Sequence, residues 1–267
     1  MKARKTIRKI LFVAMWMVIG GGMLVLLIAA IGKQKSNICN DVVITIKGVA
    51  DDKCFLTKSD ITQLLRTATK GNIKGQPKSD FNLLEMEALL EQNIWVKDAQ
   101  LYFDSKDVLH VTVSEREPVA RIFTNKGKSF YIDDEEKGIP LSENLSTKVP
   151  VFTGVPDKED RRKRDSLLLR DIKETAKFIS SHPFWQSQVA QVDLVRPHPE
   201  GDYEFEMIPV VGNHVVKLGS GSDIDRKFNR LFIFYKEILS RTGFEKYKTI
   251  DVRFAGQVIG AKDGKSK

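Results

Sequence analysis

The chain has 267 residues and a net charge of +8 at pH 7, a length that suits one large domain or two modest ones. Five of the eight excess positive charges lie within the first nine residues, which contain no acidic residue. The rest of the chain is therefore nearly balanced in charge, and its total gives no reason to expect nucleic-acid binding.

An uncharged run of 23 residues, 10–32, follows this basic start. As a helix it would be about 34 Å long, enough to cross the hydrocarbon core of a bilayer. Five basic residues precede the run and two, Lys33 and Lys35, follow it closely, which places residues 1–9 in the cytoplasm. The alternative is a cleaved signal peptide, whose apolar core usually spans about 7–15 residues. The sequence predicts an uncleaved single-span anchor, with residues 33–39 as a linker.

The two cysteines, Cys39 and Cys54, both follow the predicted span, where disulfides form if the compartment is oxidising. An expected strand over 42–47 lies between them. A bridge would require residues 48–53 to turn back along that strand, because the two α-carbons must come within about 7 Å. The residues alone leave both a disulfide and two unpaired thiols open.

The first folded part is expected to contain a strand, two helices and two strands. Residues 42–46 are rich in β-branched side chains, as strands are. Thr57 and Asp60 form a capping-box pattern for the first helix, and Asn82 can cap a second helix that ends near Gln92. The two final strands alternate between apolar and polar residues over 99–103 and 109–113.

The pattern of expected strands and helices changes after Glu117. Short strands and two long helices are expected from there on, with Pro183 ending the first helix. The last strand is expected at 248–254, extended to Ile259. The chain is therefore predicted to be of the α+β class, with a boundary between two units near Glu117. The expected strands lie at 119–124, 129–132, 149–152, 189–195, 203–208 and 214–218, and the helices at 166–181 and 224–239.

The sequence predicts no catalytic residue, no metal site and no cofactor. Its four histidines lack the spacing of metal ligands, and no Gly-x-Ser-x-Gly elbow occurs. The acidic run 133–136 is typical of a solvated turn, and Gly219–Ser222 of a turn before a helix capped by Ser222 or Asp223. The mixed-charge run 158–165 fits a solvated loop better than a patch for anionic lipid or cell-wall polymer.

A family likeness appears in a series of segments that follow one another in order. The run Ile94–Ala99, the strand Leu109–Val113 and the segment Glu115–Ala120 resemble the signature of the bacterial cell-division family FtsQ, called DivIB in some bacteria. Ile94 stands where that family usually has proline, and the short tail after Gly260 lacks an aromatic residue that some members have. Further matches are Tyr131–Asp133 with Gly138, Val149–Gly154, Val216–Gly219, Lys227 with Leu231, and Ile250–Phe254.

This resemblance implies both a domain organisation and a function. It implies a polypeptide-transport-associated (POTRA) domain at 40–116, a mixed β-domain with helices at 117–260, and a flexible tail at 261–267. It also implies a non-enzymatic scaffold of the divisome, in the bacterial inner membrane at the division septum. Such a scaffold would bind membrane proteins of the FtsB and FtsL type outside the membrane. The POTRA-like unit could provide a second docking surface.

The predicted last strand is the candidate binding site. Ile250, Val252 and Phe254 alternate with polar residues, as in a strand with one buried face. If this strand forms a sheet edge, a partner can add a strand to its unpaired N–H and C=O groups, and the family resemblance favours that arrangement. The candidate partner-binding residues are Thr249, Ile250, Asp251, Val252, Arg253, Phe254, Gly256, Gln257 and Val258.

Two other functions remain as alternatives at this point. A membrane-anchored cell-wall hydrolase would require a pocket with strongly perturbed acids or a histidine. A POTRA-type chaperone for exported proteins would bind many unfolded chains loosely instead of forming one stable complex.

Overall fold

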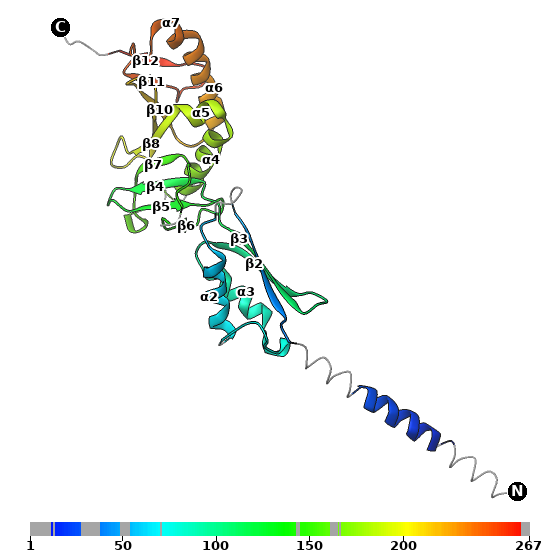
Figure 1. Ribbon diagram of the computed structural model, residues 1–267. Coiled ribbons are helices and arrows are strands. Elements are labelled where there is room, and N and C mark those ends of the chain that lie inside the picture. The colour runs from blue at the N-terminus through cyan, green and yellow to red at the C-terminus, as the bar shows by residue number, and fades with distance from the viewer. Residues whose placement is uncertain are drawn as a thin grey trace, which may run out of the picture. The chain divides into compact units, whose positions relative to one another are not determined.

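The computed structural model divides the chain into two compact units, Met1–Glu115 and Arg116–Lys267. It describes residues 12, 14–27, 38–48, 54–69, 71–142, 145–160, 165 and 167–262 (Figure 1). Arg116, which we assigned to the first domain, belongs to the second unit. Each unit has its own sheet.

The predicted membrane anchor is covered only in part. Residues 14–27 are helical and their large apolar side chains are exposed. The remainder of the predicted span (10, 11, 13 and 28–32), the basic start 1–9 and most of the linker lie outside the described residues. In the portions of the chain that are described, no helix combines the length and the hydropathy needed to cross a membrane.

The first unit has the predicted order of strand, two helices and two strands. Its sheet has the order β1-β3-β2, with β1 parallel to β3 and β2 antiparallel to it. Leu109, Val111 and Val113 of the central strand are fully buried, as the alternating pattern predicted. The elements are β1 (Asp41–Lys47), α2 (Lys58–Thr69), the 3-10 turn η1 (Lys78–Asp80), α3 (Leu83–Glu91), β2 (Val96–Phe103) and β3 (Val108–Glu115).

Both predicted helix caps are present. The Asp60 N–H donates to Thr57 Oγ1 at 3.2 Å, and the Thr57 N–H donates to the Asp60 carboxylate at 2.8 Å. The Glu85 N–H donates to Asn82 Oδ1 at 3.5 Å. These bonds satisfy N–H groups that have no partner within the first turn of a helix.

A buried carboxylate ties the chain before α2 to the end of β3. Glu115 is 4% exposed and accepts the N–H groups of Phe55 at 3.1 Å and Leu56 at 2.6 Å. Burial raises the pKa of Glu115 above its ordinary value, and the two hydrogen bonds oppose that rise only in part.

The two cysteines are not joined by a disulfide. Cys39 precedes β1, where the Asn40 N–H donates to the Asp107 carbonyl at the start of β3. Cys54 adjoins Phe55, which is bound to Glu115 at the opposite end of β3. The eight residues of β3 place its two ends about 23 Å apart, far beyond the reach of a disulfide. The bridge that the sequence left open is therefore excluded by the direction of β1.

The second unit is built on a nine-stranded mixed sheet, with the order β12-β11-β10-β9-β8-β7-β4-β5-β6. Its strands are β4 (Ala120–Thr124), β5 (Ser129–Ile132), β6 (Gly138–Ile139), β7 (Val151–Val155), β8 (Val189–Val195), β9 (Glu204–Pro209), β10 (Val215–Gly219), β11 (Thr249–Asp251) and β12 (Ile259–Ala261). Its helices are η2 (Lys158–Asp160), α4 (Leu168–Ser181), α5 (Pro183–Gln188), α6 (Ile224–Phe234), the π-helical turn η4 (Tyr235–Leu239) and α7 (Ser240–Thr242).

Helices α4, α5 and α6 pack against this sheet and form one hydrophobic core with it (Figure 1). Ile172 and Phe228 from the helices and Phe152 from the sheet are fully buried in that core. Gly154 allows β7 to approach β8 closely: its φ is +72°, and a Cβ there would lie 2.6 Å from the Leu194 carbonyl oxygen. Only glycine adopts this conformation without strain.

Three local expectations are corrected by the structure. Asp133 is fully buried because it pairs with the buried Arg116 at 2.7 Å, although the acidic run does form a turn. Asp223 occupies the N-cap position of α6, but its side chain makes no capping bond. Asp165 is 6% exposed and pairs with Arg196 at 3.0 Å, so it is not part of a solvated loop. Residues 161–164 of that run lie outside the described residues.

Candidate partner-binding site

The expectation that β11 forms the sheet edge is wrong. Strand β11 pairs with β10 on one side and with β12 on the other. The sequence suggested one extended strand from 248 to 259, but the chain turns at 254–256, where Gly256 has a φ of +76°. The predicted strand is thus two short strands joined by a turn. Ala261, which we assigned to the flexible tail, belongs to the second of them.

Strand β12 is the terminal strand of the sheet in the part of the chain that is described. Ile259 is 47% exposed, and Ala261 is also exposed. On the inner side, Asp251 lies opposite Ile259 and Thr249 opposite Ala261. The strand offers about 10 Å of edge with the outer side open.

Tyr247 packs on this strand from the core side. A Cβ at Gly260 would lie 2.6 Å from the Tyr247 ring, so any larger residue there would displace the ring. The Tyr247 ring is in turn 5.6 Å from that of Phe234 on α6. Gly260 therefore lets β12 lie close against the Tyr247 ring.

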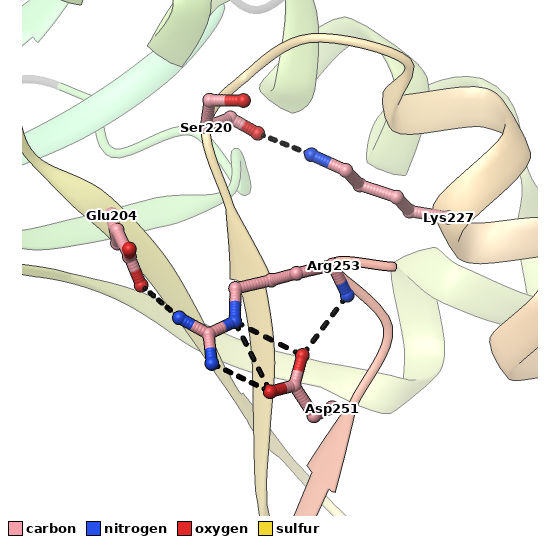
Figure 2. Close-up of polar contacts among 5 residues, drawn as sticks. All are labelled: Glu204, Ser220, Lys227, Asp251 and Arg253. Atoms are coloured by element: carbon pink, nitrogen blue, oxygen red, sulfur yellow. Dashed lines mark hydrogen bonds and ion pairs between the residues drawn. The ribbon is translucent and has the colours of Figure 1, made fainter. Parts of the chain in front are cut away.

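Arg253 fixes the chain that leads from β11 to β12 (Figure 2). Its guanidinium donates to the Asp251 carboxylate through Nε at 3.0 Å and Nη2 at 2.6 Å, and to Glu204 through Nη1 at 2.9 Å. The hydrogen bonds that Arg253 donates to Asp251 raise the pKa of Arg253. Burial alone would raise the pKa of Asp251, but the bonds from Arg253 hold it below its ordinary value. Arg253 thus connects β11 to the start of β9.

Two cations of α6 hold the adjoining loops. Lys227 is 6% exposed and its Nζ donates to the Ser220 carbonyl at 2.8 Å (Figure 2). Burial lowers the pKa of Lys227. Arg230 Nη2 donates to the Val252 carbonyl at 2.8 Å. These bonds join both loops, 220–222 and 252–258, to one helix.

Comparison with known proteins agrees with this architecture. Residues 117–261, which run from before β4 to the end of β12, match the family model described as FtsQ/DivIB, C-terminal related. The chain belongs to the FtsQ/DivIB-related family. Residues 37–114 match a POTRA-like domain, and the resemblance noted in the sequence is confirmed.

Several relatives bear the name cell division protein FtsQ. The one from Salinibacter ruber is 26% identical over 178 residues, which cover 62% of this chain and 64% of that protein. The one from a Geobacter species is 28% identical over 192 residues, with coverages of 68% and 64%. The one from Rhodothermus marinus is 26% identical over 175 residues, with coverages of 62% and 60%. The chain spans less than two thirds of the length of these curated relatives.

Within this FtsQ/DivIB-related domain, the nine predicted site residues separate into three groups. Ile250 and Val252 are fully buried, and the Val252 N–H donates to the Lys217 carbonyl at 3.1 Å, so both belong to the core. Thr249, Asp251 and Arg253 are partly exposed, and the last two are paired with each other. Phe254 and Gly256 in the turn and Gln257 after it are exposed, and Val258 is partly buried.

Of the edge residues, the sequence analysis missed Gly260 and Ala261 and expected Ile259 only as the end of one longer strand. The two glycines Gly256 and Gly260 were the available signal for a turn followed by a strand in close contact. Within the described residues, no group of three or more His, Cys, Asp or Glu side chains could hold a metal ion. The geometry offers a backbone edge for binding, and we derive no reaction from it.

Proposed function

We propose that this chain is a membrane-anchored, non-enzymatic scaffold of the bacterial divisome, which binds partners of the FtsB and FtsL type by strand addition at β12. The observation behind this proposal is the open outer side of β12 in a domain of the FtsQ/DivIB-related family. A partner strand would pair its backbone with the N–H and C=O groups on that side.

Side chains beside the edge would give the contact its specificity. Phe254 and Ile259 are each 47% exposed and lie at the two ends of the turn that leads into β12. Because β12 has three residues, backbone pairing alone supplies few hydrogen bonds. Apolar contacts with Phe254 and Ile259 would therefore contribute a large part of the binding free energy.

The proposed anchor, residues 10–32, would keep the domain at the extracytoplasmic face of the inner membrane, with the N-terminus in the cytoplasm. Confinement near the membrane raises the effective concentration of the edge toward other anchored proteins. The division septum is the site of action that this family membership favours.

Co-purification with the FtsB-type protein of the same organism tests this proposal. Ile259→Pro removes a backbone donor from β12 and disrupts its extended geometry, and we expect it to reduce co-purification at least tenfold. Asn125→Ala, in the exposed turn between β4 and β5 and far from β12 in the sheet order, is the control and should leave co-purification unchanged. A proline at Val252 would be a poor test, since it would break the internal bond to Lys217.

Thermal unfolding of each variant separates loss of the edge from loss of the fold. If the Ile259→Pro protein melts within a few degrees of the parent and still retains its partner, strand addition at β12 is wrong. Phe254→Asp leaves the backbone intact, and we expect it to weaken binding as well, because it places a charge on an apolar contact.

A further inference from the structure

The helical side of the second unit carries a pair of adjoining apolar pockets. The first, of about 450 Å³, is lined by Phe232, Phe244 and Val211, and the second, of about 470 Å³, by Trp185 and Pro183. Phe184 and Phe232 border both pockets. We call the two pockets together the helical groove.

The wall between the pockets is formed by two aromatic rings. The rings of Phe184 on α5 and Phe232 on α6 meet edge to face, with centroids 4.9 Å apart. Each of these side chains is 38% exposed, and Val211 at the side of the first pocket is 42% exposed. This apolar surface has no part in the contacts that position β12, so strand addition leaves it uncovered.

The floor of the first pocket is held in place by a buried hydrogen bond. Tyr235 and His214 are 3% and 1% exposed, and the tyrosine hydroxyl lies 2.7 Å from His214 Nε2. Tyr235 begins the π-helical turn η4, and Lys236 and Ser240 beside it also line this pocket. Single π-helical turns within helices are frequent at functional sites.

Each pocket of the groove has a cation in its lining. Lys236 lines the first pocket and Arg226 the second, together with Asp225. Both cations are exposed, and neither side chain makes a hydrogen bond or ion pair with another described residue. Ten helical positions separate them, which corresponds to about 15 Å. The groove therefore combines apolar pockets with two exposed cations: Lys236 has no acid beside it in the lining of the first pocket, and Arg226 shares the second pocket with Asp225.

This combination narrows the range of occupants. A second copy of the chain, docked groove to groove about a two-fold axis, would bring Lys236 and Arg226 against the same cations. A single lipid acyl chain requires a continuous channel, but the Phe184–Phe232 wall divides the groove. Two separate apolar side chains, about one helical turn apart, match the divided shape.

We propose that the helical groove binds an amphipathic helical segment of another protein, with one apolar side chain on each side of the Phe184–Phe232 wall and carboxylates opposite Lys236 and Arg226. The groove lies apart from the β12 edge, so the two contacts can be removed independently.

The test uses the full chain in its host cells, with the photo-crosslinking residue p-benzoylphenylalanine in place of Asn229. Asn229 is exposed and lines the second pocket beside Phe232. We expect one crosslinked protein, with the captured peptide identified by mass spectrometry as an amphipathic helix bearing carboxylates. The double variant Lys236→Glu/Arg226→Glu should lower capture about tenfold.

Two controls address the fold and the charge. Lys148→Glu/Lys158→Glu makes the same change of charge at exposed positions of the same unit, and we expect it to leave capture unchanged. Exchange of the captured segment's carboxylates for lysine should restore capture by the Lys236→Glu/Arg226→Glu protein. Co-purification through β12 should be unaffected in all of these variants, so that failure here is distinguishable from failure of strand addition.

Several outcomes would overturn the proposal. Capture of lipid or of a second copy of the chain would show a different occupant. Capture that is unchanged by Lys236→Glu/Arg226→Glu, or a captured segment without carboxylates, would show that the two cations do not select the partner. Absence of any crosslink at Asn229, while a probe at Ile259 captures a protein in the same cells, would show that the groove has no occupant.

Discussion

The Arg253 guanidinium lies 2.9 Å from the carboxylate of Glu204 on β9, and it also pairs with the carboxylate of Asp251 on β11. This contact joins the chain after β11 to the first residue of β9. Through this contact, β9 fixes the position of Arg253 and therefore of the turn at 254–256 that precedes β12.

Arg253→Lys should weaken partner binding more than it weakens the fold. Lysine keeps the charge but cannot bond both carboxylates as a planar fork. The side chain is 32% exposed, so we expect a loss of about 1 kcal/mol in the free energy of unfolding. Urea unfolding and co-purification with the FtsB-type partner measure the two effects. Partner binding equal to that of the parent would show that the Arg253 fork does not position β12.

Gly154→Ala should be strongly destabilising. The added Cβ would lie 2.6 Å from the Leu194 carbonyl oxygen, at a residue with a φ of +72°. We expect a loss of about 2–4 kcal/mol in the free energy of unfolding, from backbone strain and steric overlap together.

Gly127→Ala is its matched control. Gly127 has a φ of +81° but nothing within 4 Å of the added atom. Backbone strain therefore acts without steric overlap, and the loss in the free energy of unfolding should be about 1 kcal/mol. Urea unfolding of both variants measures the difference. Equal losses would mean that β7 and β8 adjust to the added atom.

Glu115 should make the stability of the first unit depend on pH. Because burial raises its pKa in the folded state, its contribution is complete below the unfolded-state pKa and is lost as the pH rises through the folded-state pKa. Glu115→Gln should remove this slope. It should also cost about 1–3 kcal/mol, since one amide oxygen replaces two carboxylate oxygens for the N–H groups of Phe55 and Leu56.

Hydrogen exchange of the amides of β3, followed from pH 4 to pH 8 and corrected for the intrinsic rate, reports this stability in the full chain. A pH slope that persists unchanged in the Glu115→Gln protein would assign it to another group.

His214 should have the opposite dependence in the second unit. Burial lowers its pKa, so the unfolded state binds the proton more tightly. The contribution of neutral His214 to stability is complete above the unfolded-state pKa. It is lost as the pH decreases from the unfolded-state pKa to the lower folded-state pKa. His214→Phe should remove this dependence and leave the buried Tyr235 hydroxyl without its partner, at a cost of about 1–3 kcal/mol.

The double variant His214→Phe/Tyr235→Phe should recover part of that cost, because no hydroxyl is then left buried without a partner. Thermal unfolding at pH 5 and pH 7.5 measures both effects. A pH dependence retained by the His214→Phe protein would contradict the assignment.

The sequence predicts best the elements that its periodicity defines. The alternation over 99–103 and 109–113 gave β2 and β3, and the Thr57 and Asn82 patterns gave the starts of α2 and α3. These signals are local, so they survive in a single sequence.

Features that depend on distant contacts were missed. Asp133 is buried because Arg116, 17 residues earlier, pairs with it. Strand β12 has three residues, too few for a periodic pattern to show. The helical groove exists because α5 and α6 meet through Phe184 and Phe232, which are 48 positions apart. No local pattern contains that contact.

Hydrogen exchange of the β12 amides tests the central claim most directly. The full chain is measured alone and in complex with the FtsB-type protein of the same organism, at a concentration that saturates binding. Strand addition predicts that exchange slows at least tenfold in the complex at the outward-facing N–H groups within Ile259–Ala261, because these groups acquire partners. A saturated complex in which these amides exchange as fast as in the chain alone would contradict binding at this edge.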